Sequence, residues 1–247
     1  MDYSSKVITI EKALELVRSN DQIVTGLGAA EGKEFLKHLH QVAERVSNVT
    51  VTNCLPMSDF PFMKEEYKAS FFIDGWFYSP ALRKAHKNGN ISFIPNHLHL
   101  AGAKRLFHVK PNIYVGSASK VDKHGFVSLS TSNTYEKRMI EAADIVIIEV
   151  NPNFPVTYGD LELHLDQIDY ILEVDYPVPV LPDAPSNEKD ILIGKQIAAF
   201  VQDGDCIQFG IGGIPNAVAN ALVDKKDLGV HTEMLTSGLM KLAKLGV

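Results

Sequence analysis

One local pattern occurs twice in this sequence and constrains the fold more than any other feature. The pattern Asp-x-Ile-x-x-Gly-x-Gly runs from Asp21 to Gly28 and again from Asp205 to Gly212. In both places a predicted helix comes before the pattern, and a helix and a strand come after it. Strands that alternate with helices form mainly parallel sheets covered by helices. The repeat therefore predicts two similar α/β units related by internal duplication.

The rest of the chain supports this fold class. Apolar runs of strand length occur at residues 22–26, 48–54, 71–73, 91–94, 111–117, 126–129, 145–150 and 205–209. Stretches with helical periodicity lie between them, at residues 9–19, 34–46, 79–87, 134–143 and 191–201. Residues 145–150 are apolar enough for a strand that is buried on both faces. We therefore expect an α/β fold with an open, mainly parallel sheet and flanking helices.

A proline-rich segment divides the chain. Four prolines fall within nine positions from Pro177 to Pro185, which is typical of a linker. We place an N-terminal α/β domain at residues 1–185 and the start of a second, similar domain at residues 186–247. The second copy has only about one helix after Glu233, and so small a unit exposes too much of its sheet to be stable alone. We expect this second domain to be incomplete, and to be completed by further polypeptide.

Composition excludes several classes of protein. A net charge of −6 argues against a nucleic-acid-binding surface, although an anionic small ligand needs only a local positive potential. No apolar run is long enough to span a membrane, and no signal peptide is visible. The two cysteines, Cys54 and Cys206, do not make a disulfide framework. These features predict a cytoplasmic protein with a small-molecule partner.

The second copy of the pattern is a candidate binding site. In residues 208–218 the glycines Gly210, Gly212 and Gly213 let backbone amides approach a ligand where a Cβ atom would interfere. Pro215 suits the first turn of the following helix, whose N-terminus favours negative charge. The turn is not a dinucleotide fingerprint, because Pro215 stands where the third glycine would be. It also lacks the Gly-Lys-Ser/Thr of a P-loop.

Glu233 is the candidate nucleophile. It follows the next predicted strand, at residues 229–232, and neighbouring strands of a parallel sheet end beside one crevice. A carboxylate is ionised at neutral pH and needs no separate base. It needs donors for the oxyanion that forms when it attacks a carbonyl, and the amides from Gly210 to Ile214 can supply them. Three residues that flank these two motifs are predicted to line the substrate pocket: Gln208, Asn216 and Met234.

Other candidates are weaker. Glu149, near the end of its strand, is predicted to have a structural or pocket-lining role. His97 and His99 would share a strand face, but no third ligand accompanies them, so no metal site is predicted. Three serines follow His124 closely and could suggest a serine nucleophile: Ser128, Ser130 and Ser132. No Gly-x-Ser-x-Gly elbow accompanies them, so this interpretation is weak. Five basic residues are expected to be mostly solvated, with one or two free to meet ligand phosphates: Lys104, Arg105, Lys120, Lys123 and Lys137.

The sequence resembles the acetyl-CoA hydrolase/transferase family of class I CoA-transferases, and most of all the 4-hydroxybutyrate and butyrate:acetate CoA-transferases. The resemblance covers essentially the whole chain and is carried by residues 208–218, 229–234, 120–126 and 148–152. It implies that Glu233 is the catalytic glutamate, and that residues 210–215 lie near the CoA thioester and the oxyanion. It also implies two similar α/β domains with the active site between them, and a homodimer.

The resemblance implies a reaction as well. CoA moves between a short-chain acyl-CoA, such as acetyl-, butyryl- or 4-hydroxybutyryl-CoA, and a free carboxylate, through a glutamyl-CoA thioester on Glu233. CoA is then a substrate and not a permanently bound cofactor. Because family members extend well past the point where this sequence stops, we expect the 247 residues alone to be inactive. The alternatives are an acetyl-CoA hydrolase, a non-catalytic acyl-CoA-binding fragment and a phosphosugar-binding regulator of similar architecture.

Overall fold

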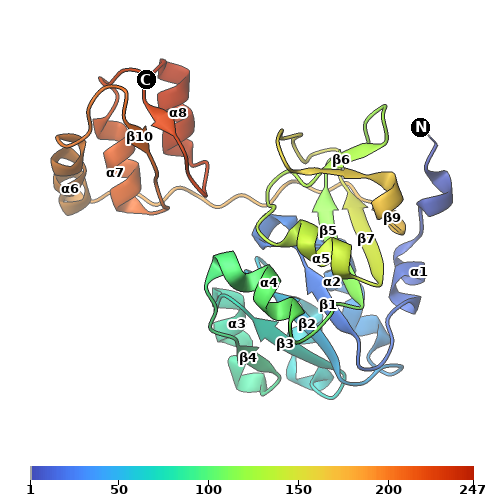
Figure 1. The fold of residues 1–247 in the computed structure, drawn as a ribbon. Helices are drawn as coiled ribbons and strands as arrows, with labels where there is room; N and C mark the ends of the chain where they lie inside the picture. The colour runs from blue at the N-terminus through green and yellow to red at the C-terminus, as the bar shows by residue number, and fades with distance from the viewer. Residues whose placement is uncertain (1) are drawn as a thin grey trace. The chain divides into compact units, whose positions relative to one another are not determined.

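The computed structural model describes residues 2–247, which form two compact units (Figure 1). Unit 1 ends at Pro179 and unit 2 comprises Val180–Val247. The division falls inside the proline-rich segment that the sequence marks as a linker.

Unit 1 is built on a parallel sheet. Its order in the described residues is β4-β3-β2-β1-β5-β7-β9, and each neighbouring pair is parallel. The strands are β1 (Gln22–Thr25), β2 (Val49–Asn53), β3 (Phe71–Gly75), β4 (Ile91–Phe93), β5 (Ile113–Ala118), β7 (Ile145–Val150) and β9 (Tyr170–Glu173). The order runs outward from β1 in one direction and from β5 in the other. The predicted α/β fold class is confirmed, and the sheet has its topological switch point between β1 and β5.

Five α-helices accompany this sheet: α1 (Ile10–Glu15), α2 (Lys33–His38), α3 (Pro80–Ala85), α4 (Ala101–Leu106) and α5 (Glu136–Ala142). Local sequence explains where several begin. The Thr9 side chain accepts from the N–H of Lys12 at the start of α1, and Ser79 does the same for Leu82 at the start of α3. An antiparallel pair, β6 (Phe126–Ser128) and β8 (Glu162–His164), forms a separate small sheet.

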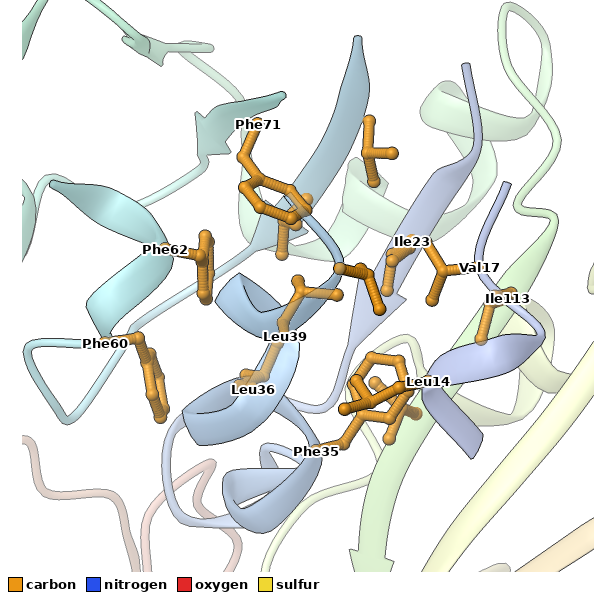
Figure 2. Close-up of a cluster of buried hydrophobic side chains, with 14 of the residues drawn as sticks. Leu14, Val17, Ile23, Phe35, Leu36, Leu39, Phe60, Phe62, Phe71 and Ile113 are labelled. Atoms are coloured by element: carbon orange, nitrogen blue, oxygen red, sulfur yellow. The ribbon is translucent and has the colours of Figure 1, made fainter. Parts of the chain in front are cut away.

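The sheet of unit 1 separates two hydrophobic cores. One core contains side chains of α1, α2 and α3, and Figure 2 shows its centre, including Phe35, Leu36 and Phe62. The other contains side chains of α4 and α5, which lie in front of the sheet in Figure 1. Strand β7 contributes Ile147 to the first core and Ile148 to the second, so it is buried on both faces as predicted.

Unit 2 is small and has its own core. It contains α6 (Glu188–Ala198), β10 (Cys206–Ile207), α7 (Gly213–Ala221), β11 (Gly229–Val230) and α8 (Ser237–Leu245). Strands β10 and β11 are parallel, with Ile207 opposite Val230. The core is built mainly from α6, α7 and α8 side chains around Ile207, and Leu222 is its most buried member.

The predicted buried strand at residues 205–209 is wrong in length and in burial. Only Cys206 and Ile207 pair, Cys206 is exposed, and both residues of β11 are exposed. In the described chain this two-stranded sheet is covered on one face alone, so only Ile207 turns into the core. Helix α7 also begins at Gly213, two residues before Pro215, which nevertheless lies in its first turn.

Candidate active site

The glycine turn connects β10 to the N-terminus of α7. Gly212 is the N-cap residue, with φ 123° and ψ −179°, a conformation that side-chain-bearing residues rarely adopt. Gly213 is needed for a different reason, because a Cβ atom there would lie 2.5 Å from Asp190 Oδ2 and 3.1 Å from the Pro185 carbonyl oxygen. The Ser186 hydroxyl donates to the Gly213 carbonyl oxygen at 2.7 Å. The start of α7 is therefore held against the start of α6.

The loop that carries Glu233 is tied to the same turn. The N–H of His231 donates to the carbonyl oxygen of Ile207 at 3.2 Å. The Thr232 hydroxyl donates to the carbonyl oxygen of Phe209, also at 3.2 Å. These bonds join the residues after β11 to the end of β10 and the residues after it. The two motifs that the sequence singles out thus meet at the carboxyl end of this strand pair, as ligand sites of parallel sheets do.

Glu233 itself is exposed. Among the described residues, no hydrogen bond or ion pair occupies its carboxylate. An ionised carboxylate that is not paired keeps its lone pairs available for attack on an electrophile. The first N–H groups of any α-helix lack partners within the helix, and those of α7 lie at the turn to which this loop is tied.

A cavity of about 330 Å³ adjoins the glycine turn. Its lining includes Gly212 and two residues predicted for the pocket, Asn216 and Met234, and the rest is mostly Leu181–Ala184 together with Ile211 and Leu235–Ser237. Gln208 and Glu233 do not line it, and Gln208 is exposed. A neighbouring cavity of about 460 Å³ shares Asn216 and reaches Lys241, whose Nζ donates to Asn220 Oδ1 at 2.8 Å. Asn216 is fixed between the two cavities by donating to the Ala184 carbonyl oxygen at 2.9 Å.

Apolar side chains surround the turn without being covered. Ile211 is 61% exposed, Met234 43% and Leu235 78%. Such a group of exposed apolar residues is typical of a surface that meets another molecule or another part of a protein.

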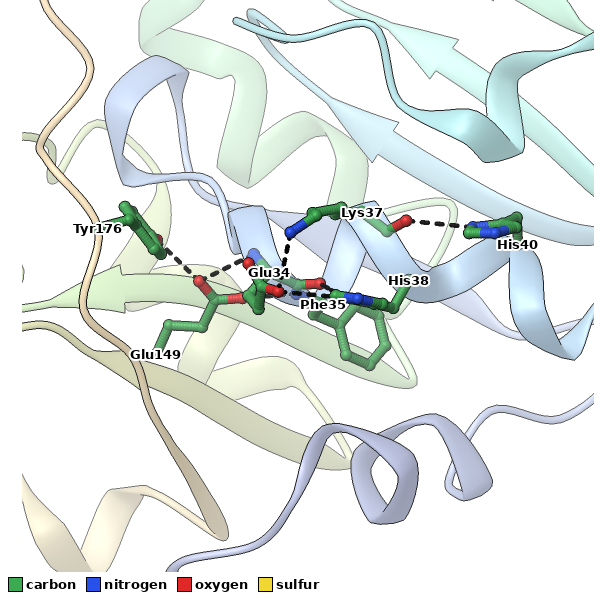
Figure 3. A network of polar contacts seen from close by, with 7 residues as sticks. All are labelled: Glu34, Phe35, Lys37, His38, His40, Glu149 and Tyr176. Atoms are coloured by element: carbon green, nitrogen blue, oxygen red, sulfur yellow. Dashed lines mark hydrogen bonds and ion pairs between the residues drawn. The ribbon is translucent and has the colours of Figure 1, made fainter.

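Glu149 is buried in unit 1 and caps a helix. Its Oε1 accepts from the N–H of Phe35 at 2.7 Å, and its Oε2 accepts from the N–H of Glu34 at 3.1 Å and lies 2.8 Å from the Tyr176 hydroxyl (Figure 3). Burial raises the pKa of Glu149 to about 7. The residue holds the first turn of α2 to the sheet, which is the structural role predicted for it.

Glu31 is a buried carboxylate that the sequence interpretation did not include. It is 1% exposed, and burial raises its pKa to about 8. Its Oε2 accepts from Asn53 Nδ2 at 3.1 Å, whereas its Oε1 and Asn53 Oδ1 have no partner in the described structure. Glu31 follows the first copy of the repeated pattern by three residues, and that position is the signal that could have identified it.

The remaining candidates are not brought into one site. His97 and His99 lie at a 3₁₀ turn and not on a strand face, with ring centroids 5.7 Å apart, so that expectation is wrong. Residues 2–247 contain no cluster of three His, Cys, Asp or Glu side chains that could hold a metal ion. Ser128 contacts Thr157 and Ser132 donates to Glu136, and neither serine bonds to His124. No helix in this part of the chain is long and apolar enough to cross a membrane.

Three of the five basic residues, Lys104, Lys120 and Lys123, are exposed as expected, and the other two differ. Arg105 is not solvated but half-buried, and its guanidinium donates to Gln22, Thr52 and Asp74. Lys137 pairs with Asp160. These two residues therefore have partners within unit 1.

Comparison with known proteins gives the family. Residues 1–182 match the model of the acetyl-CoA hydrolase/transferase N-terminal domain. The chain is 31% identical over 245 residues to the succinyl-CoA:cyclohexane-1-carboxylate CoA transferase of Geobacter metallireducens, covering 99% of this chain and 56% of that protein. It is also 31% identical over 249 residues to the 4-hydroxybutyrate coenzyme A transferase of Clostridium kluyveri, covering 99% and 57%.

Solved structures of related proteins have the same fold as this chain. RipA from Yersinia pestis matches with a TM-score of 0.93 at 28% identity, over 100% of this chain and 61% of that one. A 4-hydroxybutyrate CoA-transferase from Porphyromonas gingivalis matches with a TM-score of 0.84, over 99% and 58%. The sequence thus spans somewhat more than half the length of the relatives it matches. On the match of the N-terminal domain model and the similarity to these CoA-transferases, the chain belongs to the acetyl-CoA hydrolase/transferase family.

Proposed function

We propose that this chain is part of a CoA-transferase that moves CoA between a short-chain acyl-CoA and a free carboxylate, with Glu233 as the nucleophile. The observation that carries the proposal is the pair of bonds from His231 and Thr232, which tie the Glu233 loop to the strand entering the glycine turn. Its Clostridium kluyveri relative is named a 4-hydroxybutyrate CoA-transferase, which supports this substrate class.

In the proposed reaction, a carboxylate oxygen of Glu233 attacks the acyl-CoA carbonyl and the C–S bond breaks. This gives a mixed anhydride and CoA thiolate. The thiolate attacks the glutamyl carbonyl and expels the first carboxylate, which leaves a thioester between Glu233 and CoA. An incoming carboxylate attacks that thioester and displaces the thiolate, which then attacks the new acyl carbonyl and regenerates Glu233. No bond to water is made and the thioester energy is conserved, so ATP is not required.

Each of these steps passes through a tetrahedral oxyanion. We assign its stabilisation to backbone amides of residues 210–214 at the start of α7, with Pro215 completing the first turn. Loss of one such donor typically raises a barrier by about 3 kcal/mol. Asn216 and Met234 line the adjoining cavity and are assigned to the substrate pocket. Gln208, an exposed residue directly after β10, is proposed for the rim of the same pocket.

The complete enzyme needs more than this chain. The described chain spans about 57% of its Clostridium relative, and apolar side chains around the turn are uncovered. We propose an N-terminal domain of residues 1–185, a second domain that begins at residue 186, and an active site completed by sequence of the kind the relatives have beyond this length. We further propose a cytoplasmic homodimer that acts on acyl-CoA and binds CoA only as a substrate.

A hydrolase is the second candidate, and the exposure of Glu233 favours it. A glutamyl thioester that water can reach is hydrolysed, so transfer requires that the completed site exclude water. Product analysis with and without acetate separates the two activities. A transferase releases acetyl-CoA from butyryl-CoA and acetate, whereas a hydrolase releases free CoA in both cases.

The proposal predicts a covalent adduct on Glu233. The full-length protein, of which these 247 residues account for 27.3 kDa, is incubated with butyryl-CoA and its intact mass is measured. We expect a gain of one CoA, mapped to the peptide that contains Glu233 and removed by acetate. Glu233→Ala should give no adduct, and Glu233→Asp should react far more slowly, because its carboxylate is withdrawn by one methylene from the turn.

Glu44→Ala is the matched control, since Glu44 is an exposed glutamate of unit 1. This variant should form the adduct as the unsubstituted chain does. Near-normal turnover in Glu233→Ala would remove the nucleophile from the proposal. A non-catalytic acyl-CoA-binding protein would bind butyryl-CoA reversibly and never show the adduct, even as the full-length chain.

A further inference from the structure

A chain of close oxygen contacts runs through unit 1 from Glu149 to the backbone of Glu31. Glu149 Oε2 lies 2.8 Å from the Tyr176 hydroxyl. That hydroxyl lies 2.8 Å from the Ser117 hydroxyl, and the Ser117 hydroxyl lies 2.8 Å from the Glu31 carbonyl oxygen. Figure 3 shows the end of this chain where Tyr176 meets Glu149. Glu149, Ser117 and Glu31 are each at most 2% exposed, and Tyr176 is half-buried.

The three contacts need more protons than the two hydroxyls have. Each hydroxyl carries one proton. The Ser117 proton can point to Glu31 or to Tyr176 but not to both, and the Tyr176 proton can point to Glu149 or to Ser117. If Glu149 is ionised, one of the three contacts is therefore left without a proton, and two buried oxygens face each other at 2.8 Å.

A proton on Glu149 completes the series. Glu149 Oε2–H then donates to the Tyr176 hydroxyl, Tyr176 donates to Ser117, and Ser117 donates to the Glu31 carbonyl oxygen. The other contacts of Glu149 fit this arrangement. The shorter amide bond, from Phe35 at 2.7 Å, goes to Oε1, which remains a carbonyl oxygen. The longer one, from Glu34 at 3.1 Å, goes to Oε2, the weaker acceptor once it is protonated.

We propose that Glu149 holds a proton which closes a directional hydrogen-bonded link between two segments of unit 1, and that release of this proton breaks the link at Ser117. One segment is the turn after β1, residues 26–32, which contains Glu31. The other is residues 174–179, which we call the exit segment because they are the last residues of unit 1. The link lies at the carboxyl ends of β1, β5 and β7, next to the switch point of the sheet. It does not depend on the proposed function.

Tyr176 is the residue through which the exit segment is attached. Its carbonyl oxygen accepts from Asn151 Nδ2 at 2.9 Å and from Asn153 Nδ2 at 3.0 Å. Its ring lies 5.0 Å from Lys33 Nζ, a cation–π contact. Two residues earlier, the N–H of Val174 donates to the Val150 carbonyl oxygen. Pro177 and Pro179 follow, and no hydrogen bond of the described structure involves residues 177–179, so Tyr176 makes the last polar attachment of unit 1.

The surroundings of Glu149 place the release of its proton near neutral pH. Burial raises the pKa of Glu149 to about 7, the contacts with Phe35, Tyr176 and Glu34 oppose this, and the charge of Glu34 on α2 adds to it. Glu31 faces the site from the turn after β1, and burial raises its pKa to about 8. Lys33 on α2 provides the nearby positive charge. The sheet neighbours of Glu149 are uncharged, Ser117 on β5 and Leu172 on β9.

The test is a titration of glutamate carboxyl groups by ¹³C NMR on the complete chain, with Glu149 assigned by its loss in Glu149→Gln. We expect a midpoint near 7 instead of the ordinary value near 4.5. The decisive variant is Ser117→Ala, which removes the acceptor that the Tyr176 proton needs when Glu149 is protonated. It should lower the midpoint of Glu149 by about half to one pH unit, the equivalent of one neutral hydrogen bond.

A midpoint of Glu149 that rises or does not change in Ser117→Ala overturns the proposal. If Glu149 were always ionised, Ser117 would only assist Tyr176 as a donor, and its loss would raise the midpoint or leave it unchanged. Ser70→Ala is the matched control, because Ser70 is a buried serine of unit 1 that donates to Ala43 instead. This control should leave the midpoint where it is.

A second readout uses the unsubstituted chain and does not depend on the folding of any variant. The backbone amide signals of Glu31 and Tyr176 should show a common transition at the midpoint of Glu149, and the signal of Glu31 should show a second one near its own pKa of about 8. A midpoint of Glu149 in the ordinary range, or the absence of the common transition from either segment, would refute the link.

Discussion

At the scale of single residues, two glycines at the start of α7 are required for different reasons. Gly212 has a backbone conformation that other residues rarely adopt, and Gly213 has no room for a Cβ atom. A Cβ atom at Gly210 would meet no atom within 4 Å. A single glycine-rich motif therefore contains one position set by conformation, one by packing and one that is sterically free.

Gly213→Ala is expected to destabilise unit 2, whereas Gly210→Ala is not. Alanine at a helix position ordinarily gains up to about 1 kcal/mol over glycine, but at Gly213 the clash with Asp190 and Pro185 must be relieved by moving α6. We expect a net loss of about 1–3 kcal/mol. Hydrogen exchange of α7 amides, compared between the two variants, measures the difference. Equal protection of α7 in both would show that this packing is not tight.

The buried carboxyls should make unit 1 less stable as pH rises. The pKa values of Glu149, about 7, and Glu31, about 8, lie above the unfolded value of 4.5. Between these values the folded state binds protons that the unfolded state has released. The contribution of these two groups to the free energy of unfolding should therefore be complete below about pH 4.5. As the pH rises further, each group should lower the free energy of unfolding by about 1.4 kcal/mol per pH unit, until the pH passes the pKa of that group in the folded state.

Urea titrations between pH 5 and 8.5, followed by the fluorescence of Trp76, measure this dependence. Trp76 is the one tryptophan of the sequence and lies in unit 1, where it is 5% exposed. Glu149→Gln should flatten the part of the profile below pH 7 and leave the part that belongs to Glu31. A profile of the same slope in both proteins would show that Glu149 is not protonated in the folded state.

At the scale of elements, the helices are short and depend on their caps. Helix α6 is the longest of them in the described chain and begins with a capping box. Asn187 Oδ1 accepts from the N–H of Asp190 at 3.1 Å, and Asp190 Oδ2 accepts from the N–H of Asn187 at 2.9 Å. Because Asp190 also lies against Gly213, the cap of α6 and the glycine turn share a residue. The element that supports the proposed site is thus fixed by local sequence.

Removing the cap of α6 should therefore lower the stability of unit 2. Asn187→Ala is expected to cost about 1 kcal/mol, because the N–H of Asp190 in the first turn of α6 loses its side-chain acceptor. Asn187→Ser keeps an N-cap oxygen and should cost less than half as much. Hydrogen exchange at Asp190 and Ile191 measures the loss, and an unchanged rate in the alanine variant would contradict the capping role.

At the scale of the whole molecule, each unit is held by its own hydrophobic cores. Unit 1 has one on each face of its sheet, and unit 2 has a third around Leu222. Leu36 in the first core is fully buried. Leu36→Ala should lower the free energy of unfolding of unit 1 by about 2–5 kcal/mol, since truncation leaves a cavity. The urea transition of Trp76 measures it, with Val156→Ala, at a half-exposed position of unit 1, as a control expected to change little.

The sequence predicted most of this architecture and missed particular parts for identifiable reasons. Strand β9 was missed because its four residues follow turns and polar residues and show no alternation of their own. Helix α4 was missed because it contains a glycine and no capping side chain marks its start. Glu31 was missed because its burial results from packing of the turn after β1 against β5, which no local pattern reveals.

The sequence by itself determined the α/β class, the division near the proline-rich segment and the strand–turn–helix units, since these depend on apolar period, glycine and proline. It also predicted Glu233 and the glycine turn as candidate site residues, because both follow strands. Only the tertiary structure decided that the Glu233 loop is tied to that turn, that Arg105 is half-buried, and that Glu149, Tyr176 and Ser117 are hydrogen-bonded in series. These depend on contacts between residues 23 to 114 positions apart, and such contacts form only when the sheet sets the register of its strands.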